Sequence, residues 1–391
     1  MKKKTNQADP AAWLRENKWT CAVLAAALVL LMAGRLLAAP ARVEADEPEN
    51  RADYESAVVD QVLSDSTEKD PASDNGYRGE QLLLVTVKSG DYRGQQMQVY
   101  NYVGPLYGGP LHAGDRAAIL ISSYSDGTVN ATVYEFDRLI PLAIVAALFI
   151  AAAVIVGGRT GAKSLAALAV TLVCLFGGLL PALMKGGGTL LMTFIVCAYV
   201  AVVSLTIVGG VRKKTVCAML GAVAGTALAL LFGLLAQALT RVDGLRIDDV
   251  EPLLQLRQTG TPIGLRGLLV GGIVISALGA VMDVTMGIAS SLAEVHAANP
   301  QLSRRELFRS GMNIGRDMVG TMTNTLILAF LGSGFTLILY LYSLGLPFRQ
   351  LMCSAYVSME VVSGAASSVG VILSIPLTAL ITAAVFTREK K

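Results

Sequence analysis

Charged and histidine side chains are scarce in this chain of 391 residues. Asp, Glu, Lys and Arg make up only 16% of it, and there are two histidines, His112 and His296. It contains no GxSxG, no HExxH and no acid–His–Ser set from which a hydrolytic site is built. We therefore expect no enzyme and no bound cofactor.

Cysteines are few, and none lies in the long polar segment between residues 40 and 138. The five are Cys21, Cys174, Cys197, Cys217 and Cys353, all in or beside apolar runs. With no CxxC pair, neither a disulfide framework nor a zinc site is expected. The polar segment holds several tyrosines but few Lys or Arg, so it lacks the basic groove that nucleic-acid binding needs.

Apolar residues dominate instead. Hydrophobic residues make up 53% of the chain and the mean hydropathy is +0.57, values typical of a multi-pass membrane protein. A helix needs about 20 mostly apolar residues to cross a bilayer. Eight runs qualify, at roughly 19–39, 139–157, 164–184, 189–209, 216–239, 267–289, 318–342 and 366–386. We expect a mainly α protein, a transmembrane helix bundle spanning residues 139–386 after a first helix at 19–39.

The orientation follows from Lys and Arg in the loops. Basic residues gather in the tails, 1–18 and 387–391, and in alternate loops, around Arg159, Arg212 and Arg304. Both ends are therefore expected in the cytoplasm, in the inner (cytoplasmic) membrane and in contact with its lipids. The first span is read as an anchor, with a cleaved signal peptide as the alternative.

The outer segment, residues 40–138, is expected to hold a small all-β domain. Its first part, residues 41–56, is acidic and aperiodic and is read as a tether. Five short β-like runs follow, at 57–63, 81–88, 95–103, 116–123 and 129–136. Asp126-Gly127 favours a hairpin between the last two. A barrel or sandwich of the OB or SH3 kind is predicted, and its partner would be an envelope protein or polymer.

Asp283 is the most informative residue. No other charge lies between Arg266 and Glu294, so the acid sits in the middle of an apolar run. A charge at that depth is tolerated only where it faces the bundle interior or water. Small and polar residues recur with it at helical spacing, which predicts that Asp283 points into the bundle. Hydrogen bonding within the bundle is the structural alternative to an ion-linked role.

Several polar residues are predicted partners of Asp283 in ion or proton coupling. They are Ser290, Ser291 and Glu294 on the same run, Asn324 and Thr325 on the next, and Glu360 ahead of the last. The residues leave H⁺ and Na⁺ open as the coupled ion. No metal site is expected.

Two further segments carry local predictions. Residues 295–317 are expected to be a cytoplasmic amphipathic segment, and its short helix begins with a capping box, Ser303-x-x-Glu306. The run around Glu360 is interrupted by Ser363-Gly364, which suggests a re-entrant or interfacial helix. Residues 158–164 superficially resemble a phosphate loop, but Ala162 separates the Gly and Lys that such a loop pairs.

The order of these elements resembles that of the YibE/F family of bacterial membrane proteins. The resemblance rests on two segments, GAVMDVTMGIASSLAEVHAANPQLSRRELFRSGMNIGRDMVGTMTNTLILAFLGSG and VGVILSIPLTALITA. A weaker likeness, at the level of fold, extends to SecD/SecF and the resistance–nodulation–division exporters. That likeness implies a proton-relay role for Asp283 with Asn324 or Thr325 beside it. The small outer domain, the lack of a duplicated half and two extra spans depart from those exporters.

Two functions stay open at this point. The first is a secondary transporter or ion-driven export component that uses Asp283. The second is a membrane scaffold or assembly factor whose β domain binds an envelope partner. A homodimer would supply paired halves, but nothing in the sequence requires one.

Overall fold

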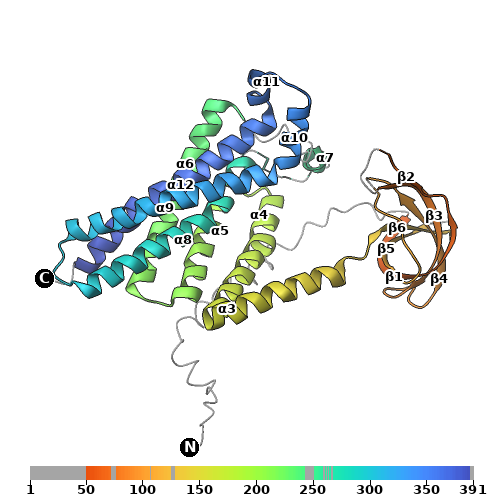
Figure 1. Cartoon of the computed structure of the whole chain (residues 1–391), viewed down its shortest axis with the longest axis horizontal. Coiled ribbons are helices and arrows are strands. Elements are labelled where there is room, and N and C mark those ends of the chain that lie inside the picture. The colour runs from red at the N-terminus through yellow and green to blue at the C-terminus, as the bar shows by residue number, and fades with distance from the viewer. Residues whose placement is uncertain are drawn as a thin grey trace, which may run out of the picture. The chain divides into compact units, whose positions relative to one another are not determined.

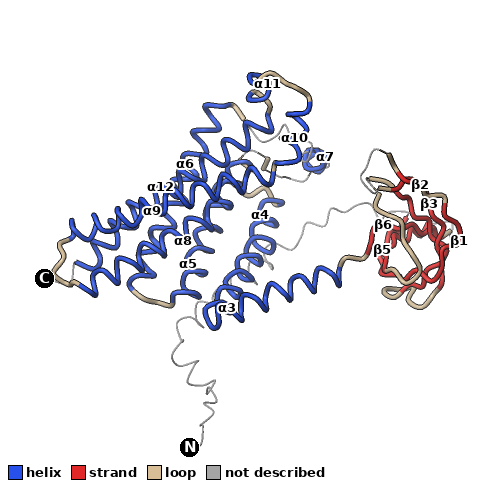
Figure 2. The backbone as a smooth tube through the Cα atoms, viewed as in Figure 1, coloured by secondary structure: helices blue, strands red, loops and turns tan. Residues whose placement is uncertain are grey.

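The computed structural model describes residues 50–387 apart from 72–75, 106, 125–127, 243–250, 259, 261, 263 and 266. The predicted first span, the linker before residue 50, Asp126-Gly127 and the tail after residue 387 lie outside the described residues. The chain divides into two compact units, residues 42–152 and the remainder. Strands occur in the first unit and helices dominate the second (Figures 1 and 2).

The first unit contains a closed β-barrel. Its strands are β1 (Asn50–Asp65), β2 (Glu68–Lys69), β3 (Tyr77–Val87), β4 (Gln96–Val103), β5 (Arg116–Tyr124) and β6 (Val129–Phe136). β1 pairs with both β3 and β5, β5 with β6, β3 with β4, and a parallel β4–β6 pairing closes the ring. This closed five-stranded ring, with β2 added beside β3, is a small β-barrel.

The predicted tether at residues 41–56 was wrong for residues 50–56, which form the first half of β1. That half pairs with β5 from Asn50↔Tyr124 to Val58↔Arg116, and the second half pairs with β3. A strand long enough to serve both neighbours joins the two sides of the barrel. Its acidic residues gave no hydrophobic alternation, because backbone pairing and not side-chain burial holds this half in place.

A buried polar network fixes the long loop between β4 and β5. Gln81 and Asn101 are 1% and 2% exposed. The Gln81 side-chain oxygen accepts hydrogen bonds from Asn101 Nδ2 at 3.0 Å and from the Leu111 backbone N–H at 2.9 Å. Gln81 Nε2 donates to Asp65 Oδ2 at 2.9 Å. Because each of these buried groups has a partner, the hydrogen bonds offset the cost of desolvation and hold the loop in place.

Asp137 links the end of the barrel to its first strand. The pKa of Asp137 is lowered because Ser56 Oγ donates a hydrogen bond to it at 2.7 Å and the Leu139 N–H donates another at 3.1 Å. A carboxyl whose folded pKa lies below the unfolded value stabilises the fold above that value, about 3.9 for Asp. The contribution disappears as the pH falls through the folded pKa.

We therefore expect Asp137→Asn to destabilise the barrel at neutral pH and to have a smaller effect in acid, where the folded carboxyl takes up a proton. The measurement is denaturant unfolding of the full chain followed by tyrosine circular dichroism, since most tyrosines lie in the barrel. An equal loss at both pH values would show that the ionised carboxylate contributes nothing.

A break at Gly158 divides the first long helix. The segment α3 (Leu139–Cys174) continues through a π-helical turn η1 (Leu175–Leu179) into α4 (Leu180–Met184), but Gly158 has φ 53° and ψ −132°. A methyl group added at Gly161 would lie 2.0 Å from the Ala153 carbonyl oxygen. Gly158 and Gly161, which gave residues 158–164 their resemblance to a phosphate loop, therefore allow a tight backbone turn. This break falls between the spans predicted at 139–157 and 164–184.

The remaining helices are α5 (Thr189–Gly209), α6 (Lys213–Thr240), α7 (Glu251–Gln258), α8 (Leu268–Ala298), α9 (Arg304–Ser333), α10 (Phe335–Ser343), α11 (Phe348–Met352) and α12 (Ala355–Thr387). Among the described residues, five helical segments are long and apolar enough to cross a membrane, or six if the bent pair α9–α10 is one span. These helices make the chain a multi-pass membrane protein. The count of eight spans stays a prediction.

Close packing through glycine holds α6 and α12 together. An added methyl group would lie 2.1 Å from Thr378 Oγ1 at Gly221, and 2.5 Å from Ala229 Cβ at Gly370. Small residues let neighbouring backbones approach this closely, which is how membrane helices gain van der Waals contact without a hydrophobic driving force. Figure 1 shows α6, α8, α9 and α12 running beside one another.

Two local predictions change at the end of the chain. The capping box of Ser303 and Glu306 is confirmed, but it opens the 30-residue helix α9 and not a short amphipathic segment. The predicted interruption at Ser363-Gly364 was wrong, because α12 runs without a break from Ala355 to Thr387. Gly364 is buried in that helix, so it packs where the sequence suggested a break.

Candidate functional site

Asp283 lies in the middle of α8 and on its open face. The Asp283 side chain is exposed, and so are Gly272, Ser276 and Gly279, which precede it at steps of three and four. A methyl group added at Gly272 or Gly279 would meet nothing within 4 Å. The described part of the chain therefore leaves the face around Asp283 and Gly279 open.

The prediction that Asp283 points into the bundle was wrong for the described residues. α8 instead buries its branched apolar face, including Val274, Val281 and Ile288, against its neighbours. The pattern of small residues separates two faces of a helix. It does not say which face meets the same chain, because both small and branched residues are suitable for helix contacts inside a membrane.

Some of the small and polar residues of α8 near Asp283 contact neighbouring helices. The Ser276 hydroxyl lies 3.1 Å from the Ser367 hydroxyl of α12. A methyl group added at Gly287 would lie 3.1 Å from Met318 Cε of α9. The open face of α8 is therefore bordered by contacts with α12 and with α9.

The predicted partners of Asp283 are not joined to it. Asn324 and Thr325 are exposed on α9, and the Thr325 hydroxyl donates to the Thr321 carbonyl at 2.9 Å. Ser290 and Ser291 are half-buried and Glu294 is exposed. Among the described residues, no hydrogen bond or ion pair links any of these side chains to Asp283.

Glu360 lies apart from Asp283, in a cavity that the sequence did not predict. It is half-buried in the second turn of α12. The cavity, of about 710 Å³, is lined by residues of α9, α10, α11 and α12, among them Phe330, Leu337, Tyr356 and Val361. Glu360 is the one charged side chain among its described lining residues.

A bend between α9 and α10 creates this cavity. The two helices meet at 63° across Gly334, and Figure 1 shows α10 turning away from the line of α9. A methyl group added at Gly334 would lie 3.7 Å from Glu360 Cγ. The run Gly332-Ser333-Gly334 inside an apolar stretch was the available signal for a break at this point.

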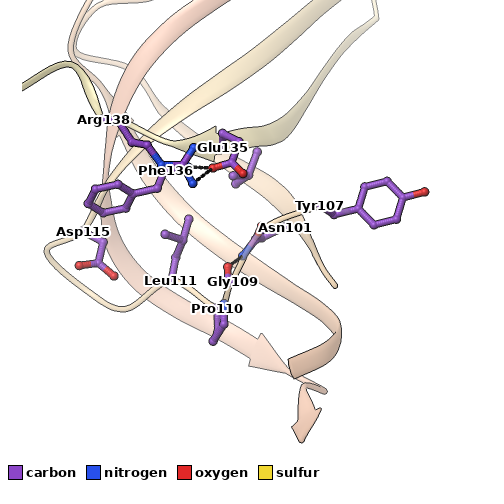
Figure 3. Close-up of a pocket in the computed structure, with 11 residues that line it drawn as sticks. Asn101, Tyr107, Gly109, Pro110, Leu111, Asp115, Glu135, Phe136 and Arg138 are labelled. Carbon is purple, nitrogen blue, oxygen red and sulfur yellow. Dashed lines mark hydrogen bonds and ion pairs between the residues drawn. The ribbon is translucent and has the colours of Figure 1, made fainter. Parts of the chain in front are cut away.

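The barrel has a smaller hollow of about 250 Å³, lined by residues that include Asn101, Tyr107, Leu111, Glu135 and Arg138. Figure 3 shows Arg138 reaching toward Glu135, while Tyr107 extends away from the other labelled side chains. Arg138 and Glu135 form an ion pair at 2.6 Å. The third charged lining residue, Asp115, accepts a hydrogen bond from the His112 N–H at 2.7 Å, so each charge has a partner and this hollow offers little for a charged ligand.

The described residues hold no group of three or more His, Cys, Asp or Glu side chains placed to bind a metal ion. His296 stacks edge to face on Phe386, with ring centroids 5.7 Å apart. The ring therefore contributes to packing at the ends of α8 and α12.

Comparison with protein-family models matched residues 145–388 to the family described as YibE/F-like protein. The match covers more than half of the chain and every helix from α5 to α12, and it begins after the barrel. Comparisons with curated proteins and with solved structures gave no match. The order of elements and the Asp283 segment had suggested the same assignment. The chain belongs to the YibE/F-like protein family.

Proposed function

We propose that this protein is a secondary transporter or an ion-driven export component of the cytoplasmic membrane, and not an enzyme. The observation that carries the proposal is Asp283, an acid that is exposed at the centre of an apolar 31-residue helix. An acid whose only role was to hold the bundle together through hydrogen bonds would be enclosed by its neighbours.

The energetic argument starts from the depth of the acid. A charged side chain at the bilayer centre costs about 2.5–3.5 kcal/mol on insertion scales, and more in other treatments. Binding a proton neutralises the carboxylate, and binding Na⁺ balances its charge. Ion binding and release at Asp283 would therefore alternate the charge of this face and change what it can contact.

Something must cover the open face while Asp283 is charged. A second copy of the chain or a water-filled cavity would do so. Ion binding at Asp283 would then change a contact or a water layer at the surface of the bundle, and the packed interior would stay as it is. This arrangement suits a coupling site, because an interface moves at a lower cost than a packed interior.

The test is charge movement by the purified full chain in liposomes on a solid-supported membrane. A jump in proton concentration and a separate jump in Na⁺ concentration distinguish the two ions. We expect a transient current for one of them and none in protein-free liposomes. A chain that responds to neither ion would contradict the proposal.

The scaffold alternative has its own observation, on the barrel. Tyr54 and Tyr134 are exposed and pack edge to face, with ring centroids 5.1 Å apart, and exposed Tyr100 and Tyr102 stack at 6.4 Å. Tyrosine is enriched at protein interfaces. A barrel that presents four tyrosines would suit an envelope protein or polymer, and a silent result in both ion jumps would favour this function.

A further inference from the structure

We propose that the Glu360 cavity binds an amphipathic organic cation, which, on the function proposed above, is the class of substrate that the protein moves. The cavity volume of about 710 Å³ lies within the range of about 300–1,000 Å³ in which small-molecule sites occur. Its walls are almost entirely apolar, so an occupant must bring hydrophobic surface.

The charge of the occupant follows from two neighbouring features. Glu360 contributes a carboxylate that has no ion-pair or hydrogen-bond partner among the described residues. The 30-residue helix α9 ends at Ser333, beside Glu360, and a helix C-terminus carries partial negative charge. Glu360 supplies the one formal charge among the described lining residues of the cavity, so a cation is the occupant with which it would pair.

No nearby side chain of the described structure supplies that positive charge. Arg349 on α11 is exposed and does not line the cavity. A bound cation would therefore supply the positive charge that the described lining residues lack. The aromatic rings of Phe330 and Tyr356 add faces that attract an organic cation.

An inorganic ion fits the cavity poorly. Hard cations take about six or more oxygen ligands, and the cavity offers few free ones. The Phe330 carbonyl at the helix end already accepts from the Gly334 N–H at 3.1 Å and from Ser333 Oγ at 2.8 Å. An organic cation needs only one carboxylate and apolar walls, which is what the cavity provides.

The experiment measures binding of tetraphenylphosphonium to the purified full chain in detergent, by calorimetry. Tetraphenylborate, which has the same shape and the opposite charge, serves as the ligand control. We expect saturable binding of the cation and none of the anion. Glu360→Gln should weaken binding of the cation at least about tenfold, because the substitution removes the one charge that faces the ligand. Glu251→Gln on the exposed helix α7 is the matched control and should bind like the wild type.

Val361→Trp provides a second variant, since Val361 is exposed, lines the cavity and can be enlarged without entering the core. It should block binding while Glu360 is still present. Equal binding by the wild type and Glu360→Gln, or binding of both ions, would overturn the proposal. Asp283→Asn should bind the cation normally, because Asp283 does not line the cavity. A loss of ion currents with intact binding would thus separate the two proposals.

Discussion

Asp283→Asn is expected to reduce the ion-jump currents to the level of protein-free liposomes. Asparagine matches aspartate in shape and can still form hydrogen bonds, but it neither takes up a proton nor supplies a negative charge for Na⁺. The open face of α8 would then carry a constant neutral group. The current of the variant, normalised to the amount of reconstituted protein, is the measurement.

Stability separates a coupling role from a structural role for Asp283. If the acid were a packing element, its replacement would destabilise the chain by breaking buried hydrogen bonds. No such bond involves Asp283 among the described residues, so Asp283→Asn should be as stable as the wild type or more stable. Removing a charge from bilayer depth favours the second outcome.

Asp317→Asn is the matched control, because Asp317 is also an exposed aspartate but lies outside the apolar run of α9. It should leave the currents unchanged. Wild-type currents in Asp283→Asn would refute coupling through this residue. A variant that fails to fold would show that the acid is structural, which also contradicts the proposal.

Gly370→Leu is expected to cause the largest loss of stability of any substitution considered. Gly370 is buried on α12, where an added Cβ would lie 2.5 Å from Ala229 Cβ and 3.2 Å from Ala229 Cα of α6. Overpacking a tight core costs about 1–3 kcal/mol and occasionally more. Because α12 also contacts α8 and α9, a shift of this helix would disturb the whole bundle.

Thermal denaturation in detergent, followed by the fraction that stays monodisperse on gel filtration, measures this effect. Gly320→Leu is the control, since an added Cβ there meets nothing within 4 Å. A compensating pair sharpens the test: Ala229→Gly should partly restore the stability lost in Gly370→Ala, by removing the atom that is approached most closely. Independent effects of the two substitutions would contradict direct contact between α6 and α12.

Much of the secondary structure could be predicted from local patterns. The run at 189–209 coincides with α5, and the strands predicted at 116–123 and 129–136 match β5 and β6 within a residue. These segments have either a regular alternation of apolar and polar residues or a long apolar run, and Gly, Asp or basic residues lie at their ends. The first half of β1 and the continuity of α12 were missed. Each depends on a partner distant in sequence, β5 for the strand and the packed bundle for Gly364.

The candidate site divides in the same way. The depth of Asp283 and the unusual presence of an acid there follow from composition along one helix. Its exposure does not, because a helical wheel sorts residues into faces without saying which neighbour each face meets. Glu360 was identified as an acid in an apolar run, but its cavity depends on the 63° bend at Gly334 and on four segments meeting around it.

The sequence by itself determined that this is a multi-pass helical membrane protein with a small β domain and an acid at the centre of one helix. Those properties come from apolar run length, alternation and charge, which are local quantities. Only the tertiary structure decided that the strands close into a five-stranded ring, that Asp283 lies on an open face and that Glu360 faces a cavity. Each of these depends on which surfaces pack together, and packing is settled by shape complementarity between segments far apart in the chain.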